Sequence, residues 1–187
     1  LFAIKFAPSL MQDLIDAGAK VNKATATETP LIFATVVGDA TAIEVLLRNG
    51  ADMYYEFRGL NAAQNAAIYD RAKILEQFLD AGFSINYQGS DGQTLLMNAI
   101  YHEHSSMADF LLIRGTDPNI RDNNGTSALN IATSNLLSAG KNFQENSNII
   151  TLLLEHGALV DNNDLNTAHY APAILTLLQK RYETHQT

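Results

Sequence analysis

Apolar residues recur along the chain at the spacing of an amphipathic helix, in short runs that each end just before a glycine. One run holds Ile43, Val45, Leu46 and Leu47 ahead of Gly50. Because glycine has no Cβ to clash at positive φ, a glycine just past such a run is expected to end the helix in the left-handed conformation. Five such glycines are spaced by 32, 32, 33 and 42 residues: Gly18, Gly50, Gly82, Gly115 and Gly157.

A second motif precedes the last four glycines and predicts another helix in each unit. Its first residue carries a side-chain oxygen that can accept a backbone N–H of the first helical turn. These opening residues are Thr29, Asn61, Thr94 and Ser127. An alanine follows at one fixed place in every copy, at Ala34, Ala66, Ala99 and Ala132. The repeated alanine predicts close packing between the helices of neighbouring units.

The last copy is longer than the others. Its motif starts 30 residues before the glycine, whereas the others start 21 residues before theirs. The extra residues fall within 134–148, where we expect a first helix lengthened by about one turn and stopped near Gly140, then a polar loop anchored by Phe143. Long loops in compact folds are often functional, and an elaboration without function is an equal alternative.

The repeat resembles the ankyrin-repeat family, whose unit is about 33 residues long and opens on Thr-Pro-Leu-His-x-Ala. The resemblance covers roughly residues 8–161. The His of the family motif is replaced by Ile32, Gln64, Met97 and Asn130. Of these, Gln64 and Asn130 can keep part of its hydrogen bonding to the neighbouring loop, and Ile32 and Met97 cannot.

The resemblance implies an all-α fold, an ankyrin-repeat solenoid of stacked helix-turn-helix units with hairpin-like finger loops. We expect a single domain over residues 1–187. Its parts are a partial repeat (1–23), repeats at about 24–55, 56–88, 89–121 and 122–161, and a capping helix at about 171–183.

The two ends of the chain fit this plan. Pro8 is placed where the second helix of a first repeat would begin, so we expect the natural chain to start before Leu1. After Pro172, apolar residues at helical spacing predict one helix to about Tyr182 that covers the last repeat, and a frayed polar tail from Glu183. The sequence is compatible with two locations of the protein: the cytoplasm, or export if an upstream signal was removed.

The composition of the chain limits the classes of partner that it is expected to bind. The net charge is −8, with 20 acidic and 12 basic residues, which argues against nucleic acid because such binding depends on Lys and Arg at phosphates. No apolar run approaches the roughly 20 residues of a membrane span. The chain has no cysteine, which excludes disulfides and thiolate metal sites. We therefore expect a protein partner with a basic patch, and a monomer in its absence.

The sequence contains no motif typical of catalysis or cofactor binding. We therefore expect that the protein is not an enzyme and that it binds no cofactor and no metal ion. His102 and His104 are two residues apart near a helix end, which predicts that they point to different faces and cannot share a metal. Ser105 and Ser106 beside His104 do not predict a triad, because triads combine distant segments.

The ankyrin resemblance implies that partners contact the finger loops and the exposed ends of the first helices. Five of the seven tyrosines fall at these positions, and tyrosine is frequent at binding hot spots. Some of these aromatic side chains could instead pack under the fingers as core. The predicted binding residues are Tyr54, Tyr55, Phe57, Arg58, Tyr69, Tyr87, Asp91, Gln93, Tyr101, His102, Arg121 and Asn123.

Two hypotheses for function follow. The first is a non-catalytic module that clasps a protein partner on its concave face; an inhibitor, for instance an immunity protein for a toxin enzyme, is its more specific version. The second is a scaffold or targeting fragment of a larger multidomain enzyme or effector.

Overall fold

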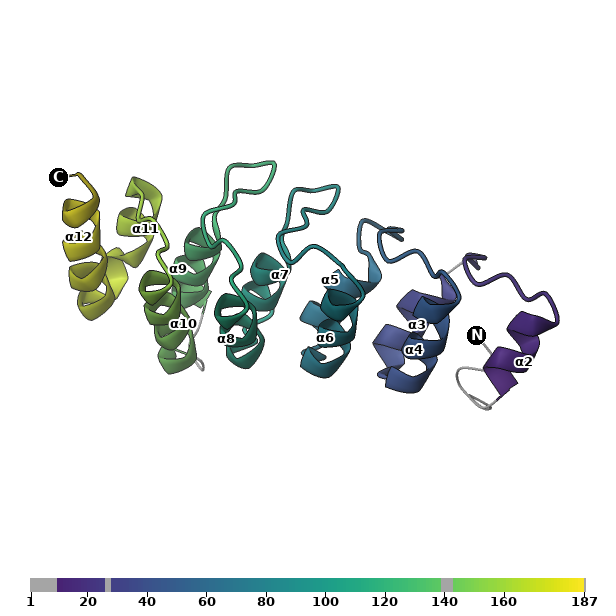
Figure 1. Ribbon diagram of the computed structural model, residues 1–187. Helices are drawn as coiled ribbons and strands as arrows, with labels where there is room; N and C mark the ends of the chain where they lie inside the picture. Colours follow the sequence, from purple (N-terminus) through teal and green to yellow (C-terminus); the bar gives the residue numbers. More distant parts are fainter. Residues whose placement is uncertain (1–9, 26–27, 139–142, 187) are drawn as a thin grey trace. The chain divides into compact units, whose positions relative to one another are not determined.

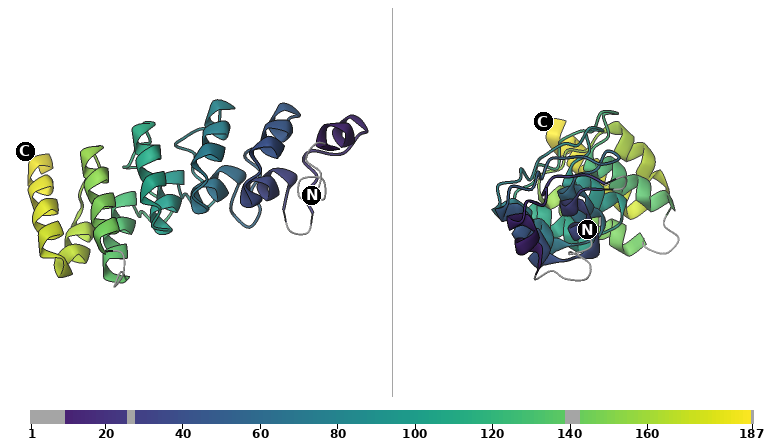
Figure 2. Two further views of the ribbon diagram at one scale, coloured as in Figure 1. Left: turned by 90° about the horizontal axis from the view of Figure 1, so that it is seen from below. Right: turned by 90° about the vertical axis from the view of Figure 1, so that its right-hand side faces the viewer.

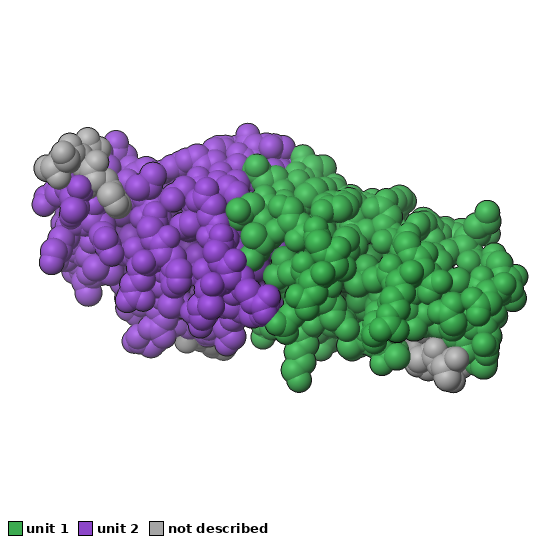
Figure 3. Space-filling model, in the orientation of Figure 1, with its two compact units in different colours: residues 1–90 green, residues 91–187 purple. Residues whose placement is uncertain are grey.

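The computed structural model describes residues 10–25, 28–138 and 143–186. Its contacts cluster into two compact units, residues 1–90 and 91–187 (Figure 3). Unit 1 contains α2 (Met11–Asp16), α3 (Pro30–Val37), α4 (Ala40–Arg48), α5 (Ala62–Ile68) and α6 (Ala72–Asp80). Unit 2 contains α7 (Leu95–Tyr101), α8 (Ser105–Ile113), α9 (Ala128–Ser138), α10 (Phe143–Glu155), α11 (Asn162–Thr167), the 3-10 helix η2 (Ala168–Tyr170) and α12 (Pro172–Gln186).

Within each unit the helices form pairs, and extended turns project from the ends of the pairs (Figure 1). In unit 1, α3 packs on α4 and on α5, and α4 packs on α6. In unit 2, α7 packs on α8 and α9, and α10 packs on α8 and α9. First helices therefore lie beside first helices, and second beside second (Figure 2). The predicted all-α fold of repeated helix pairs is confirmed, whereas the single domain over 1–187 stays a prediction.

The predicted helix caps form as the motif requires. The side-chain oxygens of Thr29 and Thr94 accept the N–H groups of Ile32 and Met97. Asn61 makes a reciprocal capping box, in which its Oδ1 accepts the N–H of Gln64 at 2.9 Å and Gln64 Oε1 accepts the N–H of Asn61 at 3.1 Å. These bonds satisfy N–H groups that an isolated helix start leaves without partners.

The glycine stops are also confirmed. At Gly115 φ is +85°, and the N–H of Thr116 donates to the carbonyl of Leu111 at 3.2 Å. This is the bond of a Schellman turn, and it needs a left-handed residue between the two partners.

The core is built from the repeat itself. The alanines of the second motif are fully buried, which lets adjacent first helices approach closely. Larger side chains from the second helices, among them Ile43, Phe78 and Leu111, are fully buried against them. Within each unit, one repeat thus covers the apolar stripe of the next, as expected of stacked repeats.

The insertion follows the prediction in part: α9 has 11 residues against 7 in α5 and α7, so the first helix is about one turn longer, as expected. The extra residues lengthen both helices of the pair, because α9 runs to Ser138 and α10 already begins at Phe143. Phe143 does not anchor a loop: it starts a helix and is 48% exposed. The predicted stop near Gly140 lies outside the described residues.

The C-terminal region also holds more helix than predicted. α11 and η2 precede the expected last helix, and α12 continues through Gln186 instead of fraying after Tyr182. A polar sequence extends a helix readily once its start is fixed by packing. No helix among the described residues has the length and apolarity to cross a membrane.

Candidate protein-binding surface

The finger between α4 and α5 holds an aromatic stack. The ring of Tyr54 lies on Phe83 with centroids 4.9 Å apart and planes at 19°, and 5.3 Å from the ring of Tyr87. Phe83 is buried, whereas Tyr54 remains 43% exposed. The stack therefore fixes one face of Tyr54 and leaves part of the ring for a partner.

Tyr87 supports this stack from the next finger. Its hydroxyl donates to Glu56 Oε1 at 3.1 Å, and the same oxygen accepts the N–H of Ser90 at 3.0 Å. Burial raises the pKa of Tyr87, and the hydrogen bond and negative charge of Glu56 add to the rise. Tyr87 is thus half-buried, and its side chain is engaged in contacts within unit 1. Its place in the sequence suggested a more exposed side chain.

The remaining predicted residues of unit 1 lie on its surface. The Arg58 guanidinium is 5.3 Å from the centroid of the Phe57 ring, a distance at which a cation is attracted to an aromatic face. Phe57 is half-buried. Tyr55 and Tyr69 are 40% and 49% exposed, so both can contact a partner.

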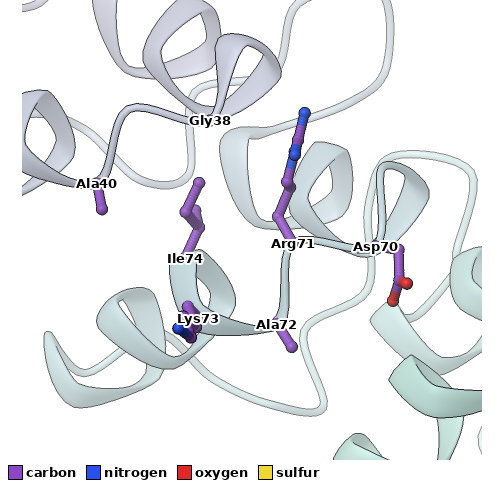
Figure 4. A pocket seen from close by; sticks show the side chains of 7 residues that line it. All are labelled: Gly38, Ala40, Asp70, Arg71, Ala72, Lys73 and Ile74. Atoms are coloured by element: carbon purple, nitrogen blue, oxygen red, sulfur yellow. The ribbon is translucent and has the colours of Figure 1, made fainter.

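Unit 1 also has an open pocket of about 350 Å³ between the turn after α3 and the start of α6 (Figure 4). The Arg71 side chain reaches toward Gly38, where an added Cβ would lie 3.3 Å from Arg71 Cζ. No sequence motif pointed to this pocket, because two turns far apart in the chain form it. Its lining residues are Gly38, Ala40, Asp70, Arg71, Ala72, Lys73 and Ile74.

In unit 2, exposed aromatic rings gather where α7 ends. Tyr101 is 64% exposed and meets the His102 ring edge-on, at 5.4 Å between centroids. The His102 ring in turn stacks on His104, at 6.2 Å and 17°. The prediction that these two histidines point to different faces is wrong, because α7 ends at Tyr101 and Glu103 turns the chain with φ +60°.

This stack affects the charge of His102. Partial burial lowers the pKa of His102, and the neighbouring His104 lowers it further. No group of three or more His, Asp or Glu side chains placed to hold a metal ion occurs among the described residues.

A backbone hydrogen bond joins the first two fingers of unit 2. The carbonyl of Asp91 accepts the N–H of Asn123 at 3.1 Å, and the Asp91 carboxylate accepts the N–H of Gln93 at 2.9 Å. Asp91 and Asn123 are exposed and Gln93 is half-buried. These predicted residues thus hold the shape of the fingers, and only part of each is presented to solvent.

Arg121 is used mostly inside its unit. Its guanidinium pairs with the carboxylate of Asp161 at 3.0 Å and donates to the carbonyl of Gly125 at 2.7 Å. Asn130 joins the same network by donating to Asp161 at 3.2 Å and to Asp164 at 2.7 Å. The expectation that Asn130 reaches the neighbouring loop is confirmed. The Arg121 guanidinium is already engaged in an ion pair with Asp161, which limits its use as a contact for another protein.

Asp161 and Asp164 were missed by the sequence analysis, although they form a capping box at the start of α11. Burial raises the pKa of Asp164 to about 6 and outweighs the hydrogen bonds from Asp161 and Asn130. Burial also raises the pKa of Asp161, but donors led by the N–H of Asp164 and the Arg121 guanidinium bring it below its ordinary value. The Asp-x-x-Asp spacing of these two residues is the feature of the sequence that could have predicted the capping box.

The chain is similar to known proteins along most of its length. A family model described as ankyrin repeats (3 copies) matches residues 64–164 and 96–182. An ankyrin repeat protein of Rickettsia bellii is 37% identical over 98 residues, which are 52% of this chain and 27% of that protein. The E3 ubiquitin-protein ligase KEG of Arabidopsis thaliana is 30% identical over 122 residues, 64% of this chain and 7% of the ligase.

A third relative is alpha-latrotoxin-Lg1a of Latrodectus geometricus, 31% identical over 128 residues. That match covers 65% of this chain and 9% of the toxin. The chain therefore spans about a quarter or less of the length of these relatives. The family model covers α6 to α11 and the fingers between these helices, and because it matches more than half of the chain, the chain belongs to the ankyrin-repeat family.

Proposed function

We propose that this chain binds a protein partner on the concave face expected of its repeats, through aromatic side chains on the fingers and at the ends of the first helices. Ankyrin repeats are in general protein–protein interaction modules and generally non-catalytic. The observation that carries the proposal is the exposure of four tyrosines at these positions, between 40% and 64%: Tyr54, Tyr55, Tyr69 and Tyr101.

The exposed rings are suited to binding because their positions are already restricted. Tyr54 rests on Phe83, and Tyr101 contacts His102. A ring held in place before binding loses little conformational freedom in the complex, and tyrosine offers a large contact area with few rotatable bonds.

Charge supports a partner with a basic patch. The chain carries a net charge of −8, and Asp52, Asp91 and Asp122 add acidic groups to the fingers. Electrostatic attraction of this kind mainly speeds association and selects partners, while the buried aromatic contacts supply most of the affinity. An inhibitor or immunity protein acting on a basic enzyme surface is one specific form of this proposal.

A second candidate is a scaffold or targeting segment within a longer protein. It is favoured by the small share of the long relatives that the repeats occupy, 7% of the ligase and 9% of the toxin. Sequencing the full open reading frame separates the two: a long flanking domain supports the targeting role, and a short leader supports a self-contained binder.

Tyr69→Ala and Tyr101→Ala together are expected to weaken the partner complex by about 3 kcal/mol or more, because exposed aromatic anchors dominate binding energies. The partner is first captured from the native source and identified by mass spectrometry, and its affinity is then measured by calorimetry. The thermal unfolding midpoint should stay near that of wild type, since both rings are largely exposed.

Ile113→Ala is the matched control, because Ile113 is 69% exposed but lies at the end of the second helix α8. It should leave the affinity unchanged. If Ile113→Ala weakens the complex while the tyrosine variants do not, the partner binds the opposite face and the proposed surface is wrong.

A further inference from the structure

The chain contains two Asn-Gly dipeptides, Asn49-Gly50 and Asn124-Gly125. In such a pair the backbone nitrogen of glycine can attack the side-chain carbonyl carbon of asparagine, because glycine has no Cβ to block the approach. The two pairs are matched in one respect. Gly50 N donates to the carbonyl of Leu47 at 3.1 Å, and Gly125 N donates to the carbonyl of Asp122 at 2.9 Å, so both attacking nitrogens are similarly engaged.

The asparagine side chains differ. Asn49 is half-buried, and its amide donates to Gln12 Oε1 at 3.0 Å and to the carbonyl of Val45 at 2.8 Å. The Asn124 side chain is exposed at the tip of its finger and makes no hydrogen bond to another described residue. Asn124 can therefore rotate toward the nitrogen of Gly125 without first breaking a contact.

We propose that Asn124 is a site of spontaneous deamidation, while Asn49 is protected by the fold. Gly125 N gives up its proton and forms a bond to Asn124 Cγ, and the bond from Cγ to the amide nitrogen breaks with release of ammonia. Water then opens the resulting succinimide at either carbonyl, which yields aspartate or isoaspartate. No oxidant or reductant takes part.

The product changes the finger in two ways. A carboxylate at position 124 adds negative charge beside Asp122, whose Oδ1 accepts the N–H groups of Asn124 and Thr126 at 2.9 and 2.8 Å. Isoaspartate also inserts one carbon into the backbone before Gly125. That insertion displaces the carbonyl of Gly125, which accepts the Arg121 guanidinium at 2.7 Å. The modification thus loosens the finger that holds Arg121, and its chemistry does not depend on the function proposed above.

The test is ageing of the purified full chain at mildly alkaline pH, in folded form and in urea. Peptide mapping by mass spectrometry follows the conversion of each asparagine, and enzymatic methylation detects isoaspartate. In the folded chain Asn124 is expected to convert about tenfold or more faster than Asn49, because two hydrogen bonds of the Asn49 side chain must break first. In urea the two rates should be similar.

Two variants sharpen the result. Gln12→Ala removes one of the bonds that hold Asn49 and should speed the conversion of Asn49 while leaving Asn124 unchanged. Asn124→Gln should abolish the early product, because a longer side chain forms the ring slowly. Equal rates at the two sites in the folded chain would overturn the proposal, and so would a difference that persists unchanged in urea.

Discussion

Gly92→Ala should destabilise unit 2 by about 3 kcal/mol, combining about 1–2 kcal/mol for a left-handed backbone with a Cβ and about 1–3 kcal/mol for overpacking. Gly92 has φ +81°, and an added Cβ would lie 2.5 Å from the backbone nitrogen of Asn123 and 2.6 Å from its Oδ1. This is the place where the Asp91 carbonyl accepts the N–H of Asn123. The clash therefore falls on backbone that cannot move without opening the contact between fingers.

Gly125→Ala provides a matched control for this effect. Gly125 occupies the equivalent position of the next finger with φ +78°, and an added Cβ there would meet nothing within 4 Å. It should lose only the conformational part, about 1–2 kcal/mol. Urea unfolding of both variants measures the difference. Equal losses would show that the contact at Asn123 relaxes freely, and the close approach of the fingers would then have no energetic weight.

The second large effect is the dependence of stability on pH through Asp164. This carboxyl is fully buried and accepts from Asn130 and from the N–H of Asp161. Burial raises the pKa of Asp164 to about 6, from an ordinary value of 3.8. Asp164 holds its proton more tightly in the folded state than in the unfolded state, so protonation of this carboxyl stabilises the fold. This contribution is complete below the pKa of the unfolded state and is lost as pH rises through 6. The expected loss is about 3 kcal/mol.

Two other groups act in the opposite direction. The pKa of Asp161 is lowered in the folded state, so its ionised carboxylate stabilises the fold. This stabilisation is lost as pH falls through the lowered pKa. The lowered pKa of His102 also removes stability as the pH falls below 6.5, although this effect is weak because His102 is exposed. The free energy of unfolding is therefore expected to have its maximum between the titrations of Asp161 and Asp164.

Asp164→Asn isolates the contribution of Asp164. Between pH 4 and 7 the free energy of unfolding of wild type should fall by about 3 kcal/mol relative to that of the variant, as measured by urea denaturation across the range. His102→Gln is a control that should keep the fall, and Asp109→Asn is a second control that removes a carboxylate of α8 outside the network. Parallel profiles for wild type and Asp164→Asn would contradict the assignment.

The binding surface could be predicted only in part. The exposure of Tyr69 and Tyr101 follows from their places at the ends of first helices, which the repeat period locates. The roles of Tyr87 and Arg121 could not be predicted, because both depend on partners roughly 30 to 40 residues away, Glu56 and Asp161. A single repeat motif does not specify which side chains of the next repeat will face it.

The sequence by itself determined the repeat, the helix caps at residues such as Thr94, the glycine stops and the buried alanines. These features depend on interactions within a few residues, so the local order of side chains is sufficient to specify them. Only the tertiary structure decided how the insertion was absorbed into α9 and α10, why His102 and His104 stack, and where Asp164 is buried. Those outcomes depend on packing between helices and on turns that reverse the chain, and hydrophobic periodicity carries no information about either.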